Sequence, residues 1–305
     1  VIITGILQFP KGTYMNEGCE LGTVETKSMT RENQPSSQCG LYYFYHVGKV
    51  GGTSVESWMK RLQKDNPRNI TAFFNWWHKG TYGKYDWRQE LSDIEDLLYS
   101  GKIAVGDKSW FQVHHHHGSP GLRYMMPRLR AWRMTLQSQG CDLILTTVLR
   151  EPFSRARSVV RYKEDVFRKD FEPFFESGEY NREAGVVNYL LFNKDIVFNP
   201  SAYSSEYFQG GSRQVNVSTE AIDEVVDYLK EFDIVGHTNE LDSFITLSEK
   251  ATGWSELIHS GFDKGKALKA NKSVPAFNIT AEMKDFMAPY LQSDLSLWKR
   301  VFGEA

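Results

Sequence analysis

Two nearly uninterrupted apolar runs, each followed by a turn and a helix-forming segment, constrain the fold of this chain most strongly. They are Leu41–Val47 (LYYFYHV) and Leu143–Leu149 (LILTTVL). Runs of this length without polar alternation are typical of strands that are buried on both faces, as in a parallel sheet covered by helices. The alternation of such strands with amphipathic segments, of which Trp87–Tyr99 is the clearest, predicts a three-layer α/β/α domain with a central parallel sheet.

The rest of the chain supplies the other elements of this domain. Hydrophobic residues make up 41% of the 305 residues, which is enough for a sizeable core. Residues 1–40 lack periodicity and are expected to form an irregular leader, whereas residues 41–305 are expected to form a single domain. The remaining expected helices are 53–63, 122–137, 153–168, 182–192, 219–231, 240–250 and 281–302. The remaining expected strands are 1–7, 102–105, 109–113 and 232–235.

Charge, cysteine content and hydropathy limit the compartments and partners of the protein. A formal net charge of −2 argues against a general nucleic-acid binder. Cys19 and Cys39 could pair in an oxidising compartment, but with Cys141 the count is odd and no CxxC is present, so neither a disulfide framework nor a zinc site is indicated. No apolar run approaches the roughly 18 residues of a membrane span, so membrane attachment is expected only through an N-terminal anchor outside this chain. Four glycosylation sequons favour the secretory pathway: Asn69, Asn216, Asn271 and Asn278.

The first motif, residues 46–54 (HVGKVGGTS), joins the first apolar run to a helix. Glycines allow the backbone to approach a ligand closely, and the N–H groups and dipole at a helix start attract an anion. A lysine adds a mobile positive charge, and two hydroxyl groups add donors. The motif is not a Walker loop, because its lysine precedes the glycines; a plain glycine-rich turn with a surface lysine is the alternative. The candidate phosphate-binding residues are Lys49, Gly51, Gly52, Thr53 and Ser54.

The second motif, Leu149–Ser158 (LREPFSRARS), follows the second apolar run. Arg150 lies at the end of the strand, where α/β sheets bind ligands, and Pro152 suits the first turn of the following helix. Arg150 can form a fork to a phosphate, and Ser158, about two helical turns further on, can donate to the same group. The alternative is an ion pair between Arg150 and Glu151.

Together the two motifs resemble the 3′-phosphoadenosine 5′-phosphosulfate (PAPS) binding motifs of the sulfotransferase superfamily. The first is similar to the 5′-phosphosulfate loop HxxKxGGTS of carbohydrate sulfotransferases, although Gly48 and Val50 depart from the usual residues. The second is similar to the 3′-phosphate motif LRDPxxRxxS, with Glu151 in place of Asp. Phe232–Asp242 (FDIVGHTNELD) resembles the FDxVGxxExLD stretch of Golgi-type polysaccharide sulfotransferases, including the heparan sulfate 2-O and 6-O enzymes. The resemblance covers residues 41–302.

The resemblance implies a P-loop-like sulfotransferase fold and a PAPS-dependent O-sulfotransferase, with PAPS as co-substrate and no metal. Lys49 would contact the leaving phosphate oxygen, residues 51–54 would hold the 5′-phosphosulfate, and Arg150 and Ser158 would hold the 3′-phosphate. The acceptor would be a carbohydrate hydroxyl in the Golgi lumen, with a cytoplasmic location as the alternative. A small-molecule or tyrosine hydroxyl and an inactive glycan-binding module are the alternative functions. A P-loop kinase is disfavoured, because both GxxxxGK[ST] and a magnesium-ligand motif are absent.

Four consecutive histidines, His114 to His117, are the candidates for a general base. Sulfuryl transfer needs the acceptor hydroxyl deprotonated, and a neutral imidazole can take that proton; the resemblance implies a histidine after the corresponding strand. In an extended segment His114 and His116 face one side, and their two neighbours the other. His116 is the preferred base, with His114 beside it. A metal-binding run and a purification-tag remnant are the alternatives.

Two further groups of residues concern the acceptor. One is an aromatic cluster that could stack on sugar rings or belong to the core: Phe73, Phe74, Trp76 and Trp77. The other is a basic helix face that could bind an anionic glycan or be an ordinary solvated face: Arg123, Arg128, Arg130 and Arg133.

Overall fold

The computed structural model describes residues 39–75, 87–100, 109–116, 120–162, 175–176, 185–191, 208–209, 216–256 and 279–303. The expected strands 1–7 and 102–105 lie outside the described residues, as does the expected leader apart from its last two residues. Among the helices of the described segments, none combines the length and apolarity that crossing a bilayer requires.

The centre of the fold is a sheet of five parallel strands in the order β2-β3-β1-β4-β7. Its strands are β1 (Gly40–Tyr45), β2 (Ile70–Asn75), β3 (Trp110–His115), β4 (Asp142–Leu149) and β7 (Ile234–His237). β1 and β4 are the two predicted apolar strands; they pair directly, and every residue in them is buried. A separate antiparallel pair is formed by β5 (Phe208–Gln209) and β6 (Asn216–Val217).

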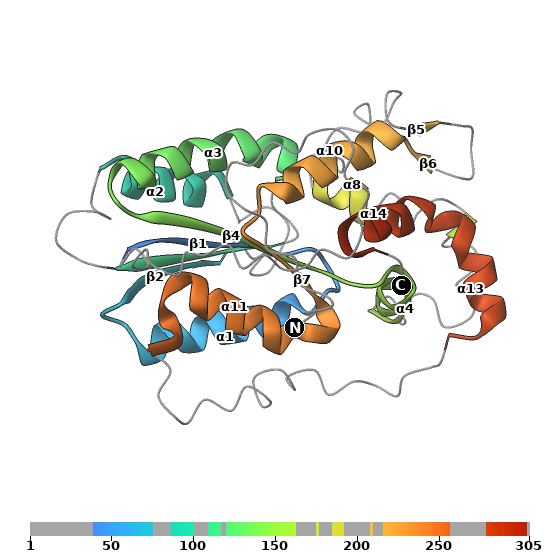
Figure 1. Ribbon diagram of the computed structural model, residues 1–305, viewed down its shortest axis with the longest axis horizontal. Helices are drawn as coiled ribbons and strands as arrows, with labels where there is room; N and C mark the ends of the chain where they lie inside the picture. The colour runs from blue at the N-terminus through green and yellow to red at the C-terminus, as the bar shows by residue number, and fades with distance from the viewer. Residues whose placement is uncertain are drawn as a thin grey trace.

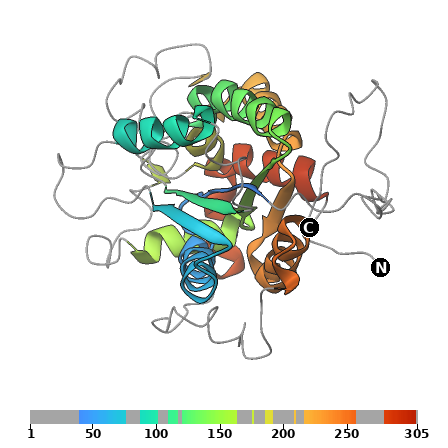
Figure 2. The ribbon, with the colours of Figure 1, turned by 90° about the vertical axis from the view of Figure 1, so that its left-hand side faces the viewer.

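Helices cover both faces of the sheet, which confirms the predicted three-layer α/β/α architecture. Figures 1 and 2 show α1 and α11 on one face and α2, α3 and α10 on the other. The helices are α1 (Gly52–Asp65), α2 (Trp87–Tyr99), α3 (Leu122–Ser138), α4 (Pro152–Tyr162), α8 (Val186–Leu191), α10 (Thr219–Lys230), α11 (Leu241–Thr252), α13 (Ala281–Met287) and α14 (Gln292–Phe302). Short 3₁₀ turns are η2 (Thr238–Glu240), η3 (Trp254–Glu256) and η4 (Ala288–Tyr290).

The C-terminal helix differs from its prediction. Residues 281–302 were expected to form one helix, but α13 and α14 are separated by η4. Pro289 lies in this turn. Because proline lacks a backbone N–H and its ring clashes with the preceding turn, it interrupts a helix at such a position.

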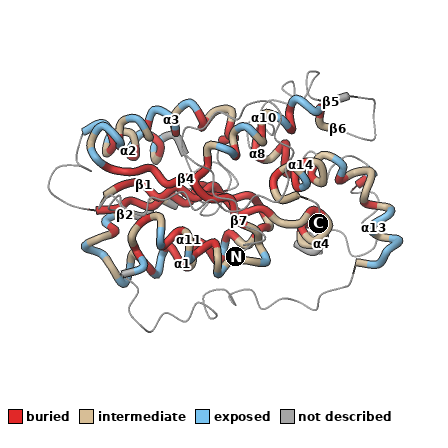
Figure 3. Tube along the Cα trace, viewed as in Figure 1, coloured by how far each residue is buried: buried red, intermediate tan, exposed pale blue. Residues whose placement is uncertain are grey.

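The core lies along the sheet and is rich in aromatic side chains, as Figure 3 shows by the concentration of buried residues there. Tyr42, Trp58 and Trp254 contact one another with ring centroids 5.4–6.0 Å apart. The Tyr42 hydroxyl finds a hydrogen-bond partner inside the core, because it donates to Ser248 Oγ at 3.0 Å. In the aromatic cluster expected near residue 75, Phe74 is half-buried on β2 and packs against this core, whereas Trp76 and Trp77 lie outside the described residues.

Cys39 forms a disulfide with Cys141, so the pairing of Cys39 with Cys19 that the sequence left open is not the one formed. Parallel register places Gly40 opposite Asp142, and the two cysteines that precede them therefore lie side by side, with their Cα atoms 5.0 Å apart. This separation suits a disulfide. The bond closes a sequence separation of 102 residues and so restricts the unfolded chain.

The basic face of α3 is used for internal ion pairs with α2, with α10 and with the residues that follow α10. Arg123 forms a forked pair with Glu224, at 2.8 and 2.6 Å. The other three arginines also contact carboxylates: Arg130 contacts Glu231, Arg133 contacts Asp233 at 2.9 Å and Arg128 contacts Glu95 at 3.5 Å. These guanidinium groups therefore join neighbouring helices, and little of their charge is left for an anionic glycan.

His115 is buried on the α3 side of the sheet. Its ring stacks on Tyr45, with centroids 4.4 Å apart, and Nδ1 is hydrogen-bonded to the Tyr43 hydroxyl. Burial lowers the pKa of His115 to about 3, because the charged imidazolium is disfavoured away from water. His115 is therefore neutral in the folded protein at physiological pH.

Acid should destabilise the fold through His115. Its pKa is lower folded than unfolded, so the contribution of neutral His115 is complete above about pH 6.5 and is lost, by about 1.4 kcal/mol per pH unit, as the pH falls toward 3. Urea unfolding from pH 7 to pH 5 should show a steeper loss in the wild type than in His115→Gln, which keeps a neutral polar side chain. Equal pH dependence in the two proteins would contradict the assignment.

Candidate functional site

The two sequence motifs meet at one end of the sheet. They follow β1 and β4, which are neighbouring parallel strands. The chain after β1 crosses one face through α1 to β2, whereas the chain after β4 returns across the other face through α10 to β7 (Figure 1). Ligands of open α/β sheets bind outside the carboxyl ends of the strands, where such connections diverge. The topology alone therefore places a candidate site at these two loops.

The loop between β1 and α1 is fixed by its carbonyl groups. Three consecutive carbonyls each accept a hydrogen bond from a different segment: Gly48 from Arg155 Nε (3.1 Å), Lys49 from Arg150 Nη1 (3.3 Å) and Val50 from Thr238 Oγ1 (2.8 Å). The Thr238 hydroxyl also lies 2.9 Å from the carbonyl oxygen of Leu149. The second motif and the turn after β7 thus determine the shape of the first motif. Sequence reasoning did not identify Thr238, because its role depends on β7 lying beside β4.

Both glycines of the first motif are required by the loop itself. Gly51 precedes α1 with φ at 95°, a left-handed conformation that favours glycine. A Cβ on Gly52 would overlap the imidazole of His46. The Ser54 N–H donates to the carbonyl of Gly51 at 2.9 Å. The N–H groups of Gly52 and Thr53, which precede this first helical hydrogen bond, are therefore the ones that an anion at the helix start would meet. Thr53 is exposed beside this helix start, whereas Ser54 is buried.

Lys49 is the one residue other than glycine with positive φ in the described part of the chain, at 67°. A left-handed conformation costs an L-residue with a side chain about 1–2 kcal/mol. Strain of this kind often marks a functional position. The identity of residue 49 is therefore not explained by the backbone, which would favour glycine.

The second motif presents positive charge that is incompletely compensated. Burial lowers the pKa of Arg150, the nearby Arg157 lowers it further, Glu151 offsets part of this effect, and Arg155 adds a smaller lowering. Arg150 Nε is buried without a hydrogen-bond partner within the described residues. The alternative pairing with Glu151 is not seen among these residues: the Glu151 carboxylate accepts hydrogen bonds from the first backbone N–H groups of α4 at 3.0 and 2.7 Å. Ser158 lies half-buried on α4.

Three histidine rings gather at the ends of β1 and β3, on the opposite face of the sheet from His115. His114 Nε2 lies 3.1 Å from His46 Nδ1, and the His116 ring centroid lies 5.4 Å from that of His46 and 5.9 Å from that of His114. The predicted alternation is therefore confirmed for residues 114–116, while His117 lies outside the described residues. His114 is 0% exposed, whereas His46 and His116 are each 6% exposed.

His46 is a site residue to which the sequence analysis gave no role. It follows β1 directly, and β1 pairs with β3 so that Tyr45 lies opposite His115. His46 and His116, one residue further along each strand, are therefore neighbours. The signal was present in the sequence, as histidines at the ends of the expected strands 41–47 and 109–113, but its use required the strand order. Within the described segments, no set of three or more histidine, cysteine or carboxylate side chains is arranged to hold a metal ion.

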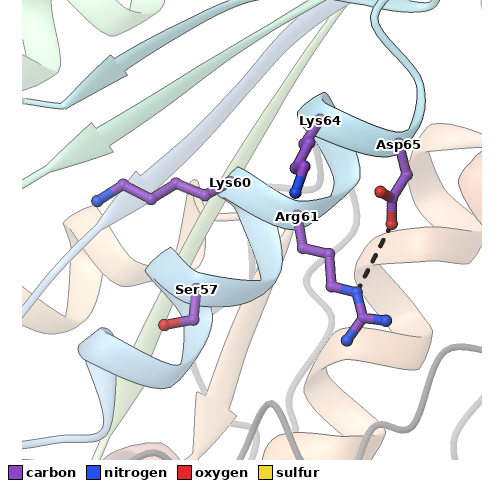
Figure 4. Close-up of a pocket in the computed structure, with 5 residues that line it drawn as sticks. All are labelled: Ser57, Lys60, Arg61, Lys64 and Asp65. Atoms are coloured by element: carbon purple, nitrogen blue, oxygen red, sulfur yellow. Dashed lines mark ion pairs between the residues drawn. The ribbon is translucent and has the colours of Figure 1, made fainter.

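An open basic hollow lies on the outer face of α1, one turn beyond Thr53. Figure 4 shows its lining residues: Ser57, Lys60, Arg61, Lys64 and Asp65. The Ser57 hydroxyl donates to the carbonyl of Thr53 at 2.8 Å. Arg61 lies 3.6 Å from Asp65, and Lys60 pairs with Glu56. The hollow is separate from the loops at the end of the sheet but begins on the same helix.

No protein-family model matches the chain, and no curated protein sequence matches it either. The site is therefore interpreted from its own residues and geometry.

Substitutions at Lys49 should separate backbone strain from the role of the side chain. Lys49→Gly should be more stable to urea than Lys49→Ala by about 1 kcal/mol, because glycine adopts the left-handed conformation without the Cβ penalty. Both variants lose the ammonium group equally. An alanine variant as stable as the glycine variant would show that residue 49 is not strained.

Proposed function

We propose that the protein transfers a sulfuryl group from PAPS to a hydroxyl group, with a carbohydrate as the acceptor. The observation that carries this proposal is the joining of the two motifs at neighbouring strand ends, where Arg150 Nη1 donates to the carbonyl of Lys49. Two anion-binding elements from distant parts of the sequence thereby face the same end of the sheet. A ligand with two separate anionic groups on one nucleoside fits this arrangement, and PAPS has a 5′-phosphosulfate and a 3′-phosphate.

Each motif offers donors for one anion. The start of α1 offers backbone N–H groups, a helix dipole and the exposed hydroxyl of Thr53. Lys49 adds positive charge on the strained residue of the same loop. The start of α4 offers Arg150, whose Nε lacks a partner in the described part of the structure, together with the neighbouring charge of Arg157. We assign the first group to the 5′-phosphosulfate and the second, with Ser158, to the 3′-phosphate.

The residues divide the chemistry between charge stabilisation and proton transfer. PAPS supplies the sulfuryl group and leaves as adenosine 3′,5′-bisphosphate. Lys49 stabilises the negative charge that develops on the leaving phosphate oxygen. His116 accepts the proton of the acceptor hydroxyl while its oxygen bonds to sulfur in line with the breaking S–O bond. His116 suits this role better than His114, because His114 is completely buried behind it.

Features outside the two motif loops bear on the acceptor and on the cellular compartment. The basic hollow on α1 begins one turn from Thr53, but its Lys60 and Arg61 pair with Glu56 and Asp65, so the hollow does not distinguish an anionic glycan from a neutral one. The Cys39–Cys141 disulfide and the four sequons favour an oxidising, secretory compartment such as the Golgi lumen. A tyrosine or small-molecule hydroxyl remains the alternative acceptor, and an inactive glycan-binding module is the alternative without transfer.

Nucleotide binding should show a strong preference for a 3′-phosphate. Adenosine 3′,5′-bisphosphate at 100 times its dissociation constant should stabilise the protein by about 2.7 kcal/mol and raise the melting temperature by several degrees. ATP at the same concentration should stabilise far less, because it lacks the 3′-phosphate. Arg150→Gln should reduce the difference between the two nucleotides. Equal thermal shifts with both nucleotides in the wild-type protein would contradict the proposed function.

The histidines should differ sharply although they are adjacent. His116→Gln should lower kcat/KM by 10²–10⁴-fold, the usual contribution of a general base, and should abolish the loss of activity in acid that protonation of the base causes. Its affinity for adenosine 3′,5′-bisphosphate should be unchanged. His115→Gln is the control, because His115 faces the opposite side of the sheet. If chelator abolished activity, or if His116→Gln were as active as the control, the base assignment would be wrong.

A further inference from the structure

We propose that Arg155, although it belongs to the second motif, is a positioning residue for the first. This inference rests on the proposed function and assigns a residue that acts through the Lys49 loop rather than on the ligand. Arg155 lies near the start of α4 and its side chain is 1% exposed. Its Nε donates to the carbonyl of Gly48 at 3.1 Å.

The contact with Gly48 acts on the strained residue of the site. Gly48 directly precedes Lys49, whose φ is 67°. The carbonyl oxygen of Gly48 belongs to the peptide plane that leads into Lys49, so a bond that fixes this carbonyl also limits rotation about the Lys49 N–Cα bond. Arg155 therefore helps to hold Lys49 in a conformation that the lysine would otherwise leave. The orientation of the ammonium group depends on that conformation.

Asp294 is the buried acidic partner of Arg155. Its Oδ2 lies 3.9 Å from Arg155 Nη1, and its side chain is 3% exposed. Its Oδ1 accepts a hydrogen bond from the backbone N–H of Val186, the first residue of α8, at 2.7 Å. A single buried chain of contacts thus runs from α8 through α14 and α4 to the Lys49 loop.

The burial of this pair argues for orientation rather than stability. Burying two charges is costly, and a buried ion pair can often be replaced by apolar residues without loss of stability. What an apolar pair cannot supply is a donor to the Gly48 carbonyl. A direct contact of Arg155 with phosphate is disfavoured by its burial, whereas Arg150 and Arg157 on the same segment are only half-buried.

The test measures the contributions of the 3′-phosphate and the 5′-phosphate to nucleotide affinity separately. Adenosine 3′-phosphate measures the second motif alone, and adenosine 3′,5′-bisphosphate measures both motifs. The double variant Arg155→Met/Asp294→Asn removes both charges together, and the asparagine oxygen can still accept the Val186 N–H. Val159→Ala is the control: this buried residue lies on the same helix in a separate cluster with Ala156, Phe175 and Met287. Circular dichroism melting verifies that each variant is folded.

In the double variant, affinity for adenosine 3′-phosphate should stay within twofold of wild type. The additional affinity that the 5′-phosphate confers should fall at least tenfold, kcat should fall with it, and Val159→Ala should change neither. An equal loss of affinity for both nucleotides would make Arg155 a ligand of the 3′-phosphate. An unchanged contribution of the 5′-phosphate would make Arg155 merely structural. Either result would overturn this inference and leave the proposed function standing. If wild-type protein binds neither nucleotide, the proposed function fails and the inference fails with it.

Discussion

The parallel pairing of β1 with β4 determines where almost every feature of functional interest lies. At the amino ends of these strands the pairing brings Cys39 beside Cys141, and at the carboxyl ends it brings the two motif loops together. The pairing is reinforced by the two threonines inside the apolar run of β4. Thr146 Oγ1 and Thr147 Oγ1 donate to backbone carbonyls of β1 at 3.1 and 2.8 Å. Buried hydroxyl groups are tolerated there because each has a partner.

The partners of the arginine side chains distinguish the candidate site from the rest of the described structure. The arginines of α3 contact carboxylates of α2, of α10 and of the segment that follows α10, and they serve to join these elements. At the carboxyl end of the sheet the acidic side chains are used differently. Glu151 caps α4, and Asp294 is buried against Arg155. The charge of Arg150, close to other arginines, is therefore well suited to an anionic ligand.

The sequence predicted those parts of the fold that depend on local pattern. The central strands and the helices Trp87–Tyr99, Leu122–Ser138 and Thr219–Lys230 lie within a residue or two of their predicted bounds. β2 was missed, because its short sequence ITAFFN was interpreted only as part of an aromatic cluster. The long C-terminal helix was predicted without allowance for Pro289.

The candidate site was predicted only as far as strand ends could be recognised. Lys49 and Arg150 were each recognised as anion-binding candidates because each follows a buried strand, and only the resemblance assigned them to one ligand; in the structure Arg150 donates to the carbonyl of Lys49. His46, Thr238 and the Cys39–Cys141 bond were missed, because each depends on which strands are neighbours. Strand order is a property of the whole chain and cannot be read from a local motif.

We propose that the two anion sites serve transfer and not only binding. The most direct measurement incubates the protein with PAPS radiolabelled on sulfur and a panel of anionic glycans, neutral glycans, tyrosine peptides and small alcohols. We expect label to move to a glycan hydroxyl and adenosine 3′,5′-bisphosphate to form in equal amount. Binding of PAPS without transfer of label to any acceptor in the panel would contradict it and would favour an inactive binding module.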